Sequence, residues 1–239
     1  VVLPKPKIEF MSPEWRELLA FGIQEAARVG LQVSVNLSSC AGALKGPWEV
    51  GGDAPKRLIC QTTALPGGTR FAAALIRPDR KHFWDIAAFA VRYGGPPLAG
   101  NAEWVNAGDG VYSMRAASGK RVDAQAAVEH RTAVEIVELT DKVDAQGRLA
   151  WDVPTGQWAL VRFGFTTIDG HEYDVDVLDA QAVEGHFNRM GKAILADAGP
   201  LAGRTLTHFY SVSWEGAVPT WTGGLEREFA KYRGYAVRP

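Results

Sequence analysis

The order of apolar and polar residues predicts a helix near the N-terminus, followed by a strand. Ser12 is a favourable N-cap, Pro13 suits the first helical position, and Gly30 is a typical residue for ending a helix. The apolar residues between them recur at the spacing of one buried helical stripe: Trp15, Leu18, Leu19, Gly22, Ile23 and Ala26. Apolar and polar residues alternate along residues 31–37, and some of the apolar ones are β-branched. This pattern predicts a strand. This segment is therefore expected to form one α/β unit.

Residues 58–165 have a different pattern. Short apolar and β-branched runs are separated by clusters rich in Gly, Pro and Asp, which favours antiparallel strands in a small unit resembling a β-sandwich. The predicted strands are 58–65, 70–77, 83–93, 128–139 and 158–165. Residues 98–119, rich in Gly, Ala and Asn, are predicted to be a long surface connection.

The α/β pattern returns after residue 165. The predicted elements are a helix capped by Asp179 and ended by Gly199, a strand over 205–210, and a last helix capped by Thr222. The first of these helices is expected to bury one face, made by Val183, Phe187, Met190 and Ile194. Strand 205–210 is expected to lie beside strand 31–37, because consecutive units of one sheet pack side by side.

Together these patterns predict a domain order as well as a fold class. Residues 1–57 and 166–239 are expected to form an α/β barrel-like segment, and 58–165 an inserted antiparallel β domain. The α/β parts hold only about 130 residues, whereas a closed eight-unit barrel takes about 200 or more. We therefore expect a partial (β/α) barrel, belonging to a larger enzyme.

The composition is that of an ordinary folded chain. Of 239 residues, 46% are hydrophobic and 22% charged, which excludes intrinsic disorder. The formal net charge of −1 gives no reason to expect a nucleic-acid or membrane partner. No apolar run approaches the roughly 18 residues of a membrane helix, and the first residues show no signal-peptide pattern. Motifs of phosphate loops, zinc proteases and serine hydrolases are absent as well.

The strongest candidate for chemistry is Glu215, shortly after the strand predicted over 205–210. Catalytic residues of α/β sheets and barrels gather at the carboxyl ends of strands. Aromatic faces such as those of Trp214 and Trp221 stack on sugar rings, and an apolar neighbour raises a carboxyl pKa, as a general acid requires. The alternative interpretation is a surface glutamate beside a core tryptophan.

Three carboxylates lie close together at Glu172, Asp174 and Asp176. In an extended chain, the two-residue period would place all three on one side. They could then hold a hard cation such as Ca²⁺, or one of them could supply a second catalytic acid. The alternative is a solvated acidic loop before the helix capped by Asp179.

A third candidate feature is the loop of residues 36–49, which follows the strand predicted over 31–37. It would face the same edge of the sheet as Glu215. Asn36 and Trp48 could contact a sugar in that position. An equally open interpretation is an ordinary connecting loop that buries its apolar side chains.

Segments spread in order along nearly the whole chain resemble the catalytic region of the α-L-rhamnosidases of glycoside hydrolase family 106. The matching segments are 11–15, 25–31, 46–48, 154–158, 162–166, 182–187, 213–216, 221–222, 228–229 and 233–235. The chain departs from the family pattern at two places. Val212 stands where members carry an Asp before Ser-Trp-Glu, and Asp174 stands where an alignment on Asp176 would have a Glu.

The resemblance implies a (β/α) barrel larger than this chain, with attached β-sandwich domains and an inverting mechanism. It implies Glu215 as one catalytic carboxylate, with Asp174 or Glu172 as the other. It also implies an associated calcium, for which Asp176 is the candidate ligand, and no organic cofactor. A periplasmic or secreted bacterial location would fit the family.

These observations favour a glycoside hydrolase acting on α-L-rhamnosides or a related deoxysugar, with a carbohydrate as its partner. Asn36, Trp48, Trp214 and Trp221 are the expected sugar contacts. The alternative is a non-catalytic carbohydrate-binding or structural fragment, which self-associates or requires flanking segments of the same enzyme. A polysaccharide lyase is a third reading, but it calls for a Tyr or His base beside an Arg, and the sequence shows no such cluster.

Overall fold

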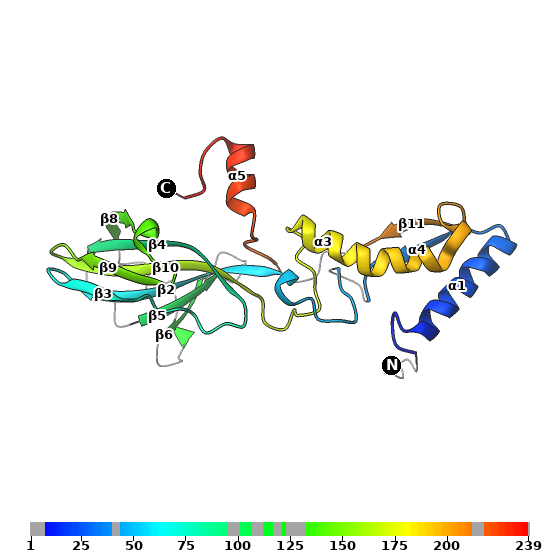
Figure 1. Ribbon diagram of the computed structural model, residues 1–239, viewed down its shortest axis with the longest axis horizontal. Helices are drawn as coiled ribbons and strands as arrows, with labels where there is room; N and C mark the ends of the chain where they lie inside the picture. Colours follow the sequence, from blue (N-terminus) through cyan, green and yellow to red (C-terminus); the bar gives the residue numbers. More distant parts are fainter. Residues whose placement is uncertain are drawn as a thin grey trace. The chain divides into compact units, whose positions relative to one another are not determined.

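A computed structural model describes residues 8–39, 44–94, 101–106, 112–116, 121–122, 132–211 and 218–238. Of the strands between 101 and 122, and of Thr132, it describes the backbone alone. The chain divides into two compact units (Figure 1). The first unit comprises Val1–Pro55, Ile168–Val218 and Glu226–Pro239, and the second comprises Lys56–Thr167 and Pro219–Leu225.

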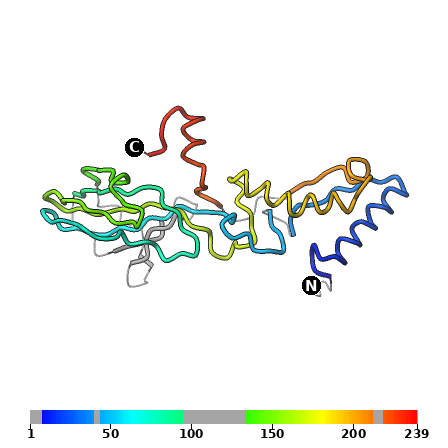
Figure 2. The backbone as a smooth tube through the Cα atoms, in the orientation of Figure 1, coloured from blue at the N-terminus to red at the C-terminus, as the bar shows by residue number. Residues whose placement is uncertain are grey.

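The first unit contains a small parallel sheet and the helices around it. Its elements are α1 (Pro13–Arg28), β1 (Val33–Asn36), a 3₁₀ turn (Gly51–Asp53), α3 (Ala180–His186), a π-helical turn (Phe187–Gly191), α4 (Lys192–Ala198), a 3₁₀ turn (Gly199–Leu201), β11 (Leu206–Tyr210) and α5 (Leu225–Arg233), whose first residue belongs to the second unit. Strands β1 and β11 pair in parallel and end at the same edge, where Asn36 faces Tyr210. Figure 2 shows them side by side. The predicted adjacency of these two strands is confirmed.

Helix α1 begins and ends at the predicted residues. The Ser12 hydroxyl accepts a hydrogen bond from the Trp15 amide at 3.3 Å, and Gly30 has the positive φ of +73° that favours glycine after a helix. The core of this unit is made by Ile23, Val35, Met190, Ile194, Ala198 and Leu206. An Arg16–Asp197 ion pair at 2.6 Å joins α1 to α4 at the edge of this core.

The predicted stripe of α1 is wrong at Leu18, whose relative exposure is 53%. The inward side of the helix runs through Ile23, which is in the buried core, and through Trp15 and Leu19, which are partly buried and pack against it. Leu18 is displaced from Leu19 by about 100° around the axis, so it leaves the contact face even though its spacing fits a helical stripe.

The second unit is antiparallel throughout its described strands. Its elements are β2 (Lys56–Pro66), β3 (Arg70–Ala74), β4 (Phe83–Gly94), β5 (Asn101–Asn106), β6 (Tyr112–Ala116), β7 (Arg121–Val122), β8 (Thr132–Glu138), a 3₁₀ turn (Thr140–Lys142), β9 (Arg148–Asp152) and β10 (Gln157–Thr167). Seven strands form one sheet in the order β7-β6-β5-β2-β10-β4-β8, and β3 pairs with β9 in a separate ribbon. The antiparallel prediction is therefore confirmed for this region.

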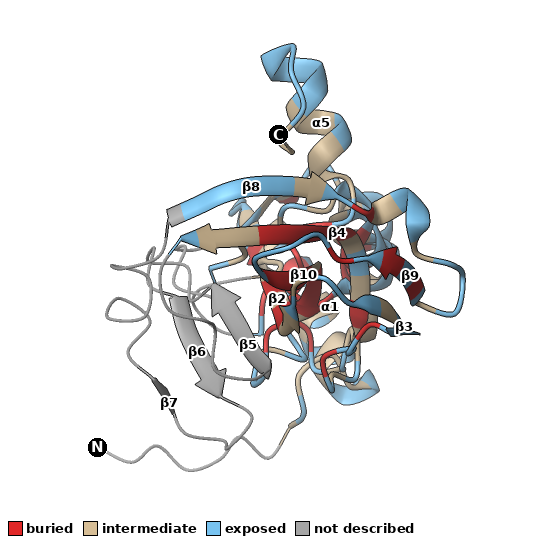
Figure 3. Cartoon of the chain, turned by 90° about the vertical axis from the view of Figure 1, so that its left-hand side faces the viewer, coloured by how far each residue is buried: buried red, intermediate tan, exposed pale blue. Residues whose placement is uncertain are grey.

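The ribbon and one face of the large sheet share a core. Trp151 on β9 meets Trp158 on β10 edge to face at 5.3 Å between ring centroids, and Leu149, Ala90 and Leu160 pack around them. Figure 3 shows buried residues along β4 and β10, whereas β8 is mainly exposed. Two layers thus enclose an apolar interior, which gives this unit a core of its own.

Some predicted boundaries are wrong. Residues 98–119, expected to be a surface connection, contain strands β5 and β6, and β9 was not predicted. Strand β5 pairs with β2 and β6 along five residues each, so partners distant in sequence stabilise a segment whose composition resembles a loop. A barrel is not confirmed, because the described residues hold a single pair of parallel strands. None of the described helices is long and apolar enough to cross a membrane.

We expect Gly164→Ala to destabilise the chain by at least about 2 kcal/mol. Gly164 lies where the β4–β10 register shifts, and a Cβ there would come within 2.5 Å of the Trp84 carbonyl oxygen and press on the Phe83 ring. Gly22 in α1 has nothing within 4 Å of such a Cβ, so Gly22→Ala should instead stabilise by about 0.5–1 kcal/mol. Urea unfolding of both variants measures the contrast, and equal effects would contradict it.

Candidate active site

Two of the predicted features pack together beyond the carboxyl end of β1. The backbone of residues 44–50 runs against the turn of residues 171–176. The Val175 amide donates to the Leu44 carbonyl at 2.9 Å, and the Val50 amide donates to the Glu172 carbonyl at 2.9 Å. Lys45 and Asp174 form an isolated antiparallel bridge between these hydrogen bonds. The loop after β1 and the acidic segment therefore form one structure in the first unit.

Asp174 is the most constrained carboxylate of this site. It is 4% exposed, and its two oxygens have different partners. Oδ1 lies 3.3 Å from Lys45 Nζ, and Oδ2 lies 2.7 Å from His171 Nδ1. Because a carboxylate only accepts, Nδ1 carries the hydrogen of the latter contact. Each oxygen keeps a further lone pair, so the carboxylate is fixed in orientation but can still accept a hydrogen bond.

Glu172 differs from Asp174 in its exposure and in its hydrogen-bond partner, although it is only two residues away. Its side chain is exposed, and Oε1 accepts the Gly170 amide at 2.9 Å. The expected alignment of Glu172, Asp174 and Asp176 on one side is wrong. The segment forms a turn, in which the Asp174 amide donates to the His171 carbonyl at 3.1 Å, and this turn breaks the two-residue alternation.

Asp176 is fully buried, and its Oδ1 accepts the Leu178 amide at 3.1 Å. Within the described ranges, no group of three or more His, Cys, Asp or Glu side chains is placed to hold a metal ion. Calcium binding stays a prediction from the family resemblance.

Trp48 lies beside a cation and a histidine. The Arg189 guanidinium is 3.9 Å from the centroid of its ring, a cation–π contact that covers one face. The ring of His186 is 6.3 Å away and tilted. Asn36, the last residue of β1, is half-buried opposite Tyr210. Asn36 and Trp48 therefore flank the same loop, as their positions in the sequence suggested.

The remaining candidates are not placed with this group. Glu215 and Trp214 lie outside the described residues. Trp221 belongs to the second unit, where its backbone bridges to Lys56, so its position is described only within that unit. The sequence reasoning missed Lys45 and His171 as partners of Asp174. The three-residue spacing of His171 and Asp174, which suits a side-chain contact across one turn, could have indicated the second of these.

His186 is a buried histidine that holds the end of β1. Its Nε2 donates to the Leu37 carbonyl at 2.8 Å, and the residue is 5% exposed. Burial lowers the pKa of His186 and outweighs the opposing effect of the Leu37 hydrogen bond, while the nearby Arg189 charge lowers it further. A π-helical turn begins at the next residue, and such turns are frequent at functional sites.

This lowered pKa predicts a loss of stability in acid. Above the ordinary histidine pKa of about 6.5, His186 is neutral in both the folded and the unfolded chain and does not change the free energy of unfolding. As the pH falls below this value, His186 binds a proton in the unfolded chain but stays neutral in the folded chain, so the free energy of unfolding falls. His186→Gln keeps a donor for Leu37 but cannot be protonated. Between about pH 7.5 and pH 5, its free energy of unfolding should fall less than that of the wild type. Urea titrations at both pH values test this, and parallel losses would refute it.

Comparisons with known proteins relate this chain to one family. The family model of glycoside hydrolase family 106, described as alpha-L-rhamnosidase, matches residues 2–91 and 105–239. A protein of Formosa agariphila, provisionally named a beta-glucuronidase, is 25% identical over 246 aligned positions, which cover 98% of this chain and 21% of that protein. A rhamnosidase structure from Novosphingobium sp. PP1Y matches 99% of this chain with a TM-score of 0.69 and 17% identity, and this chain spans 36% of it.

Proposed function

Because this chain belongs to glycoside hydrolase family 106, the α-L-rhamnosidase family, we propose that it is a segment of the catalytic region of an enzyme that hydrolyses terminal α-L-rhamnosyl linkages, or those of a related deoxysugar. The observation that best supports a site in this segment is the ordered carboxylate of Asp174, held by Lys45 and His171. It lies where the loop after β1 meets the turn of residues 171–176.

The proposed chemistry uses two carboxyl groups. In an inverting hydrolase, a general acid protonates the leaving oxygen while a general base activates water on the opposite face of the sugar. We assign Glu215 and Asp174 to this pair. The segment that contains Glu215 follows β11, whose last residue pairs with Asn36 at the end of β1. Glu172 is the weaker candidate, because its exposed side chain serves the local turn at Gly170.

The fixed contacts of Asp174 suit a base or an electrostatic partner of the acid. Two N–H donors hold its oxygens before any substrate arrives, so little reorganisation is needed during the reaction. Which of the two carboxyl groups is the acid is left to experiment. Asn36, Trp48 and Trp214 are the proposed sugar contacts. No step of this proposal is assigned to calcium.

A second candidate function is a carbohydrate-binding or structural segment without catalysis of its own. One observation favours it: the chain spans 21% of the curated relative and 36% of the solved relative that it matches. A barrel site draws residues from several strands, so this segment can hold part of the machinery and still need the remainder for turnover.

The test is hydrolysis of 4-nitrophenyl α-L-rhamnoside by the 239-residue chain, with the matching β-D-glucuronide as a comparison substrate. We expect release of nitrophenol from the rhamnoside, with the anomer formed first, followed by NMR, inverted. Retention would contradict the inverting mechanism, because a retaining enzyme uses its second carboxylate as a nucleophile. Cleavage of the glucuronide alone would show that the substrate is a glucuronide and not a rhamnoside. Binding of rhamnose without cleavage would favour the second candidate function.

A further inference from the structure

The Asp174 site has a buried carboxylate and an accessible imidazole. The side chain of His171 is 35% exposed, whereas that of Asp174 is 6% exposed. Lys45 is as exposed as His171, but an ammonium group has no lone pair with which to accept a proton. A general base must lie within about 2.6–3.2 Å of the water that it deprotonates. Water can therefore reach the imidazole more easily than the carboxylate behind it.

The contact with Asp174 fixes the tautomer of a neutral His171. Nδ1 lies 2.7 Å from Oδ2 and carries the hydrogen, because a carboxylate only accepts. Nε2 is then the acceptor, directed away from Asp174, and no described residue forms a hydrogen bond to it. An imidazole with one nitrogen bonded to a buried carboxylate and the other open is the usual arrangement of a histidine general base.

Asp174 is held in the position that such a base requires. Its Oδ1 lies 3.3 Å from Lys45 Nζ, and its amide donates to the His171 carbonyl at 3.1 Å. These contacts keep the carboxylate against the ring, where its charge stabilises the imidazolium that forms when Nε2 takes up a proton. The charge of Lys45 opposes the same imidazolium, which favours release of the proton after the reaction. Asp174 is also one methylene shorter than the Glu of the family pattern, so the ring of His171 extends its reach.

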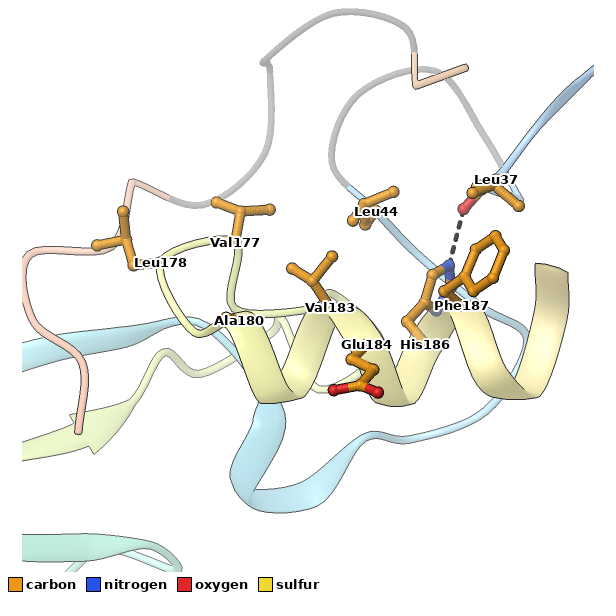
Figure 4. Close-up of a pocket in the computed structure, with 9 residues that line it drawn as sticks. All are labelled: Leu37, Leu44, Val177, Leu178, Ala180, Val183, Glu184, His186 and Phe187. Carbon is orange, nitrogen blue, oxygen red and sulfur yellow. Dashed lines mark hydrogen bonds between the residues drawn. The ribbon is translucent and has the colours of Figure 1, made fainter. Parts of the chain in front are cut away.

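The other two histidines of the first unit lack this arrangement. His186 donates through Nε2 to the Leu37 carbonyl, the dashed line in Figure 4, and its Nδ1 is buried. His208 is exposed, but its Nδ1 contacts the Thr207 hydroxyl at 2.8 Å rather than a carboxylate. Among the histidines of this unit, His171 thus combines a buried carboxylate partner with an open nitrogen.

We propose that His171 is the general base of the hydrolysis and that Asp174 acts through it. This role rests on the proposed function, because it needs a glycoside as the substrate. Nε2 takes a proton from water, and the water oxygen bonds to the anomeric carbon. The bond from that carbon to the leaving oxygen breaks with its electron pair, and Glu215 protonates that oxygen. The imidazolium then gives its proton to solvent, and Glu215 takes one up from it.

Two replacements of His171 distinguish a base from a residue that only holds Asp174. His171→Asn keeps an N–H group at the position of Nδ1 but has no basic nitrogen, and His171→Ala removes both. We expect kcat on 4-nitrophenyl α-L-rhamnoside to fall at least about 100-fold in both variants, with KM within about threefold. His82→Asn, at a histidine of the second unit, is the matched control and should keep kcat within about threefold of the wild type.

Azide gives a second readout, which a purely structural role would not change. It is an anionic nucleophile that can attack the anomeric carbon without losing a proton, so it needs no base. Sodium azide should raise nitrophenol release by His171→Ala at least about tenfold and give a glycosyl azide of inverted configuration. The wild type should show no such acceleration.

The tautomer can be measured without catalysis. In ¹⁵N NMR, at a pH where the ring is neutral, we expect the hydrogen of His171 on Nδ1 and none on Nε2. A hydrogen on Nε2 instead would overturn the proposal.

The remaining outcomes separate this role from the proposed function. Turnover of His171→Asn close to that of the wild type, or no azide rescue of His171→Ala, would contradict the base role alone. Thermal unfolding checks that the variants are folded, and if His171→Ala is not, the rescue is measured on His171→Asn. A folded wild type that has the expected tautomer but hydrolyses no glycoside would contradict the proposed function, and the base role with it.

Discussion

Replacing Glu215 by Gln is expected to lower kcat on an aryl α-L-rhamnoside by at least about 100-fold, the usual effect of losing a general acid or base. The amide has nearly the size of the carboxyl group, so the fold should be retained while proton transfer is lost. The measurement is turnover of the active enzyme, with both forms matched by thermal unfolding.

A control variant distinguishes the loss of the Glu215 carboxyl group from the loss of any carboxyl group on the chain. Glu17 is exposed on α1, away from the first unit's core, so Glu17→Gln should leave turnover within about threefold of the wild type. Unchanged turnover of Glu215→Gln would falsify the catalytic role. Glu215 would then be a neighbour of Trp214 in sequence and nothing more.

Asp174→Asn is expected to lower turnover by at least about 100-fold as well. The asparagine is the same size, but it removes the negative charge that Lys45 and His171 hold in place. It should also cost about 1–2 kcal/mol of stability, at the low end for charged hydrogen bonds because both partners are about one-third exposed. Activities are therefore compared at a temperature where both forms are folded.

Glu172→Gln provides the matched comparison for Asp174→Asn. It alters an exposed carboxylate two residues away and should change turnover by less than about threefold. If instead Glu172→Gln abolishes turnover and Asp174→Asn does not, the assignment of the second carboxyl group is reversed. Equal, small effects of both would leave Asp174 as a structural link between residues 45 and 171.

The elements that could be predicted from the sequence are those with local chemical signals. Ser12 and Gly30 delimit α1 because capping and a positive φ depend on the residues themselves. Asp179 caps α3 for the same reason, accepting the Gln181 amide at 2.9 Å. Strands β5 and β6 were missed because their stabilisation comes from pairing across the sheet, which local composition does not encode.

The candidate site likewise has features that could be predicted from the sequence and contacts that could not. The pairing of β1 with β11 could be predicted, because a general packing rule applies to consecutive units of one sheet. The contact of Asp174 with Lys45 could not, because it depends on the register of a single bridge between two loops. Likewise, nothing near His186 in the sequence identifies the Leu37 carbonyl, 149 residues away, as its partner.

The pairing of Lys56 with Thr167, at one end of β2 and β10, has a consequence for how the chain folds. The two halves of the first unit are far apart in sequence; Arg16 and Asp197, which contact each other, are separated by 181 positions. The second unit is nearly continuous and can form hairpins early. Once Lys56 and Thr167 are joined, the loop closed by β1 and β11 shortens from about 170 residues to about 60, which reduces its entropic cost by about 1 kcal/mol. The inserted strands would thus form first during synthesis and bring the two halves of the α/β unit within reach of each other.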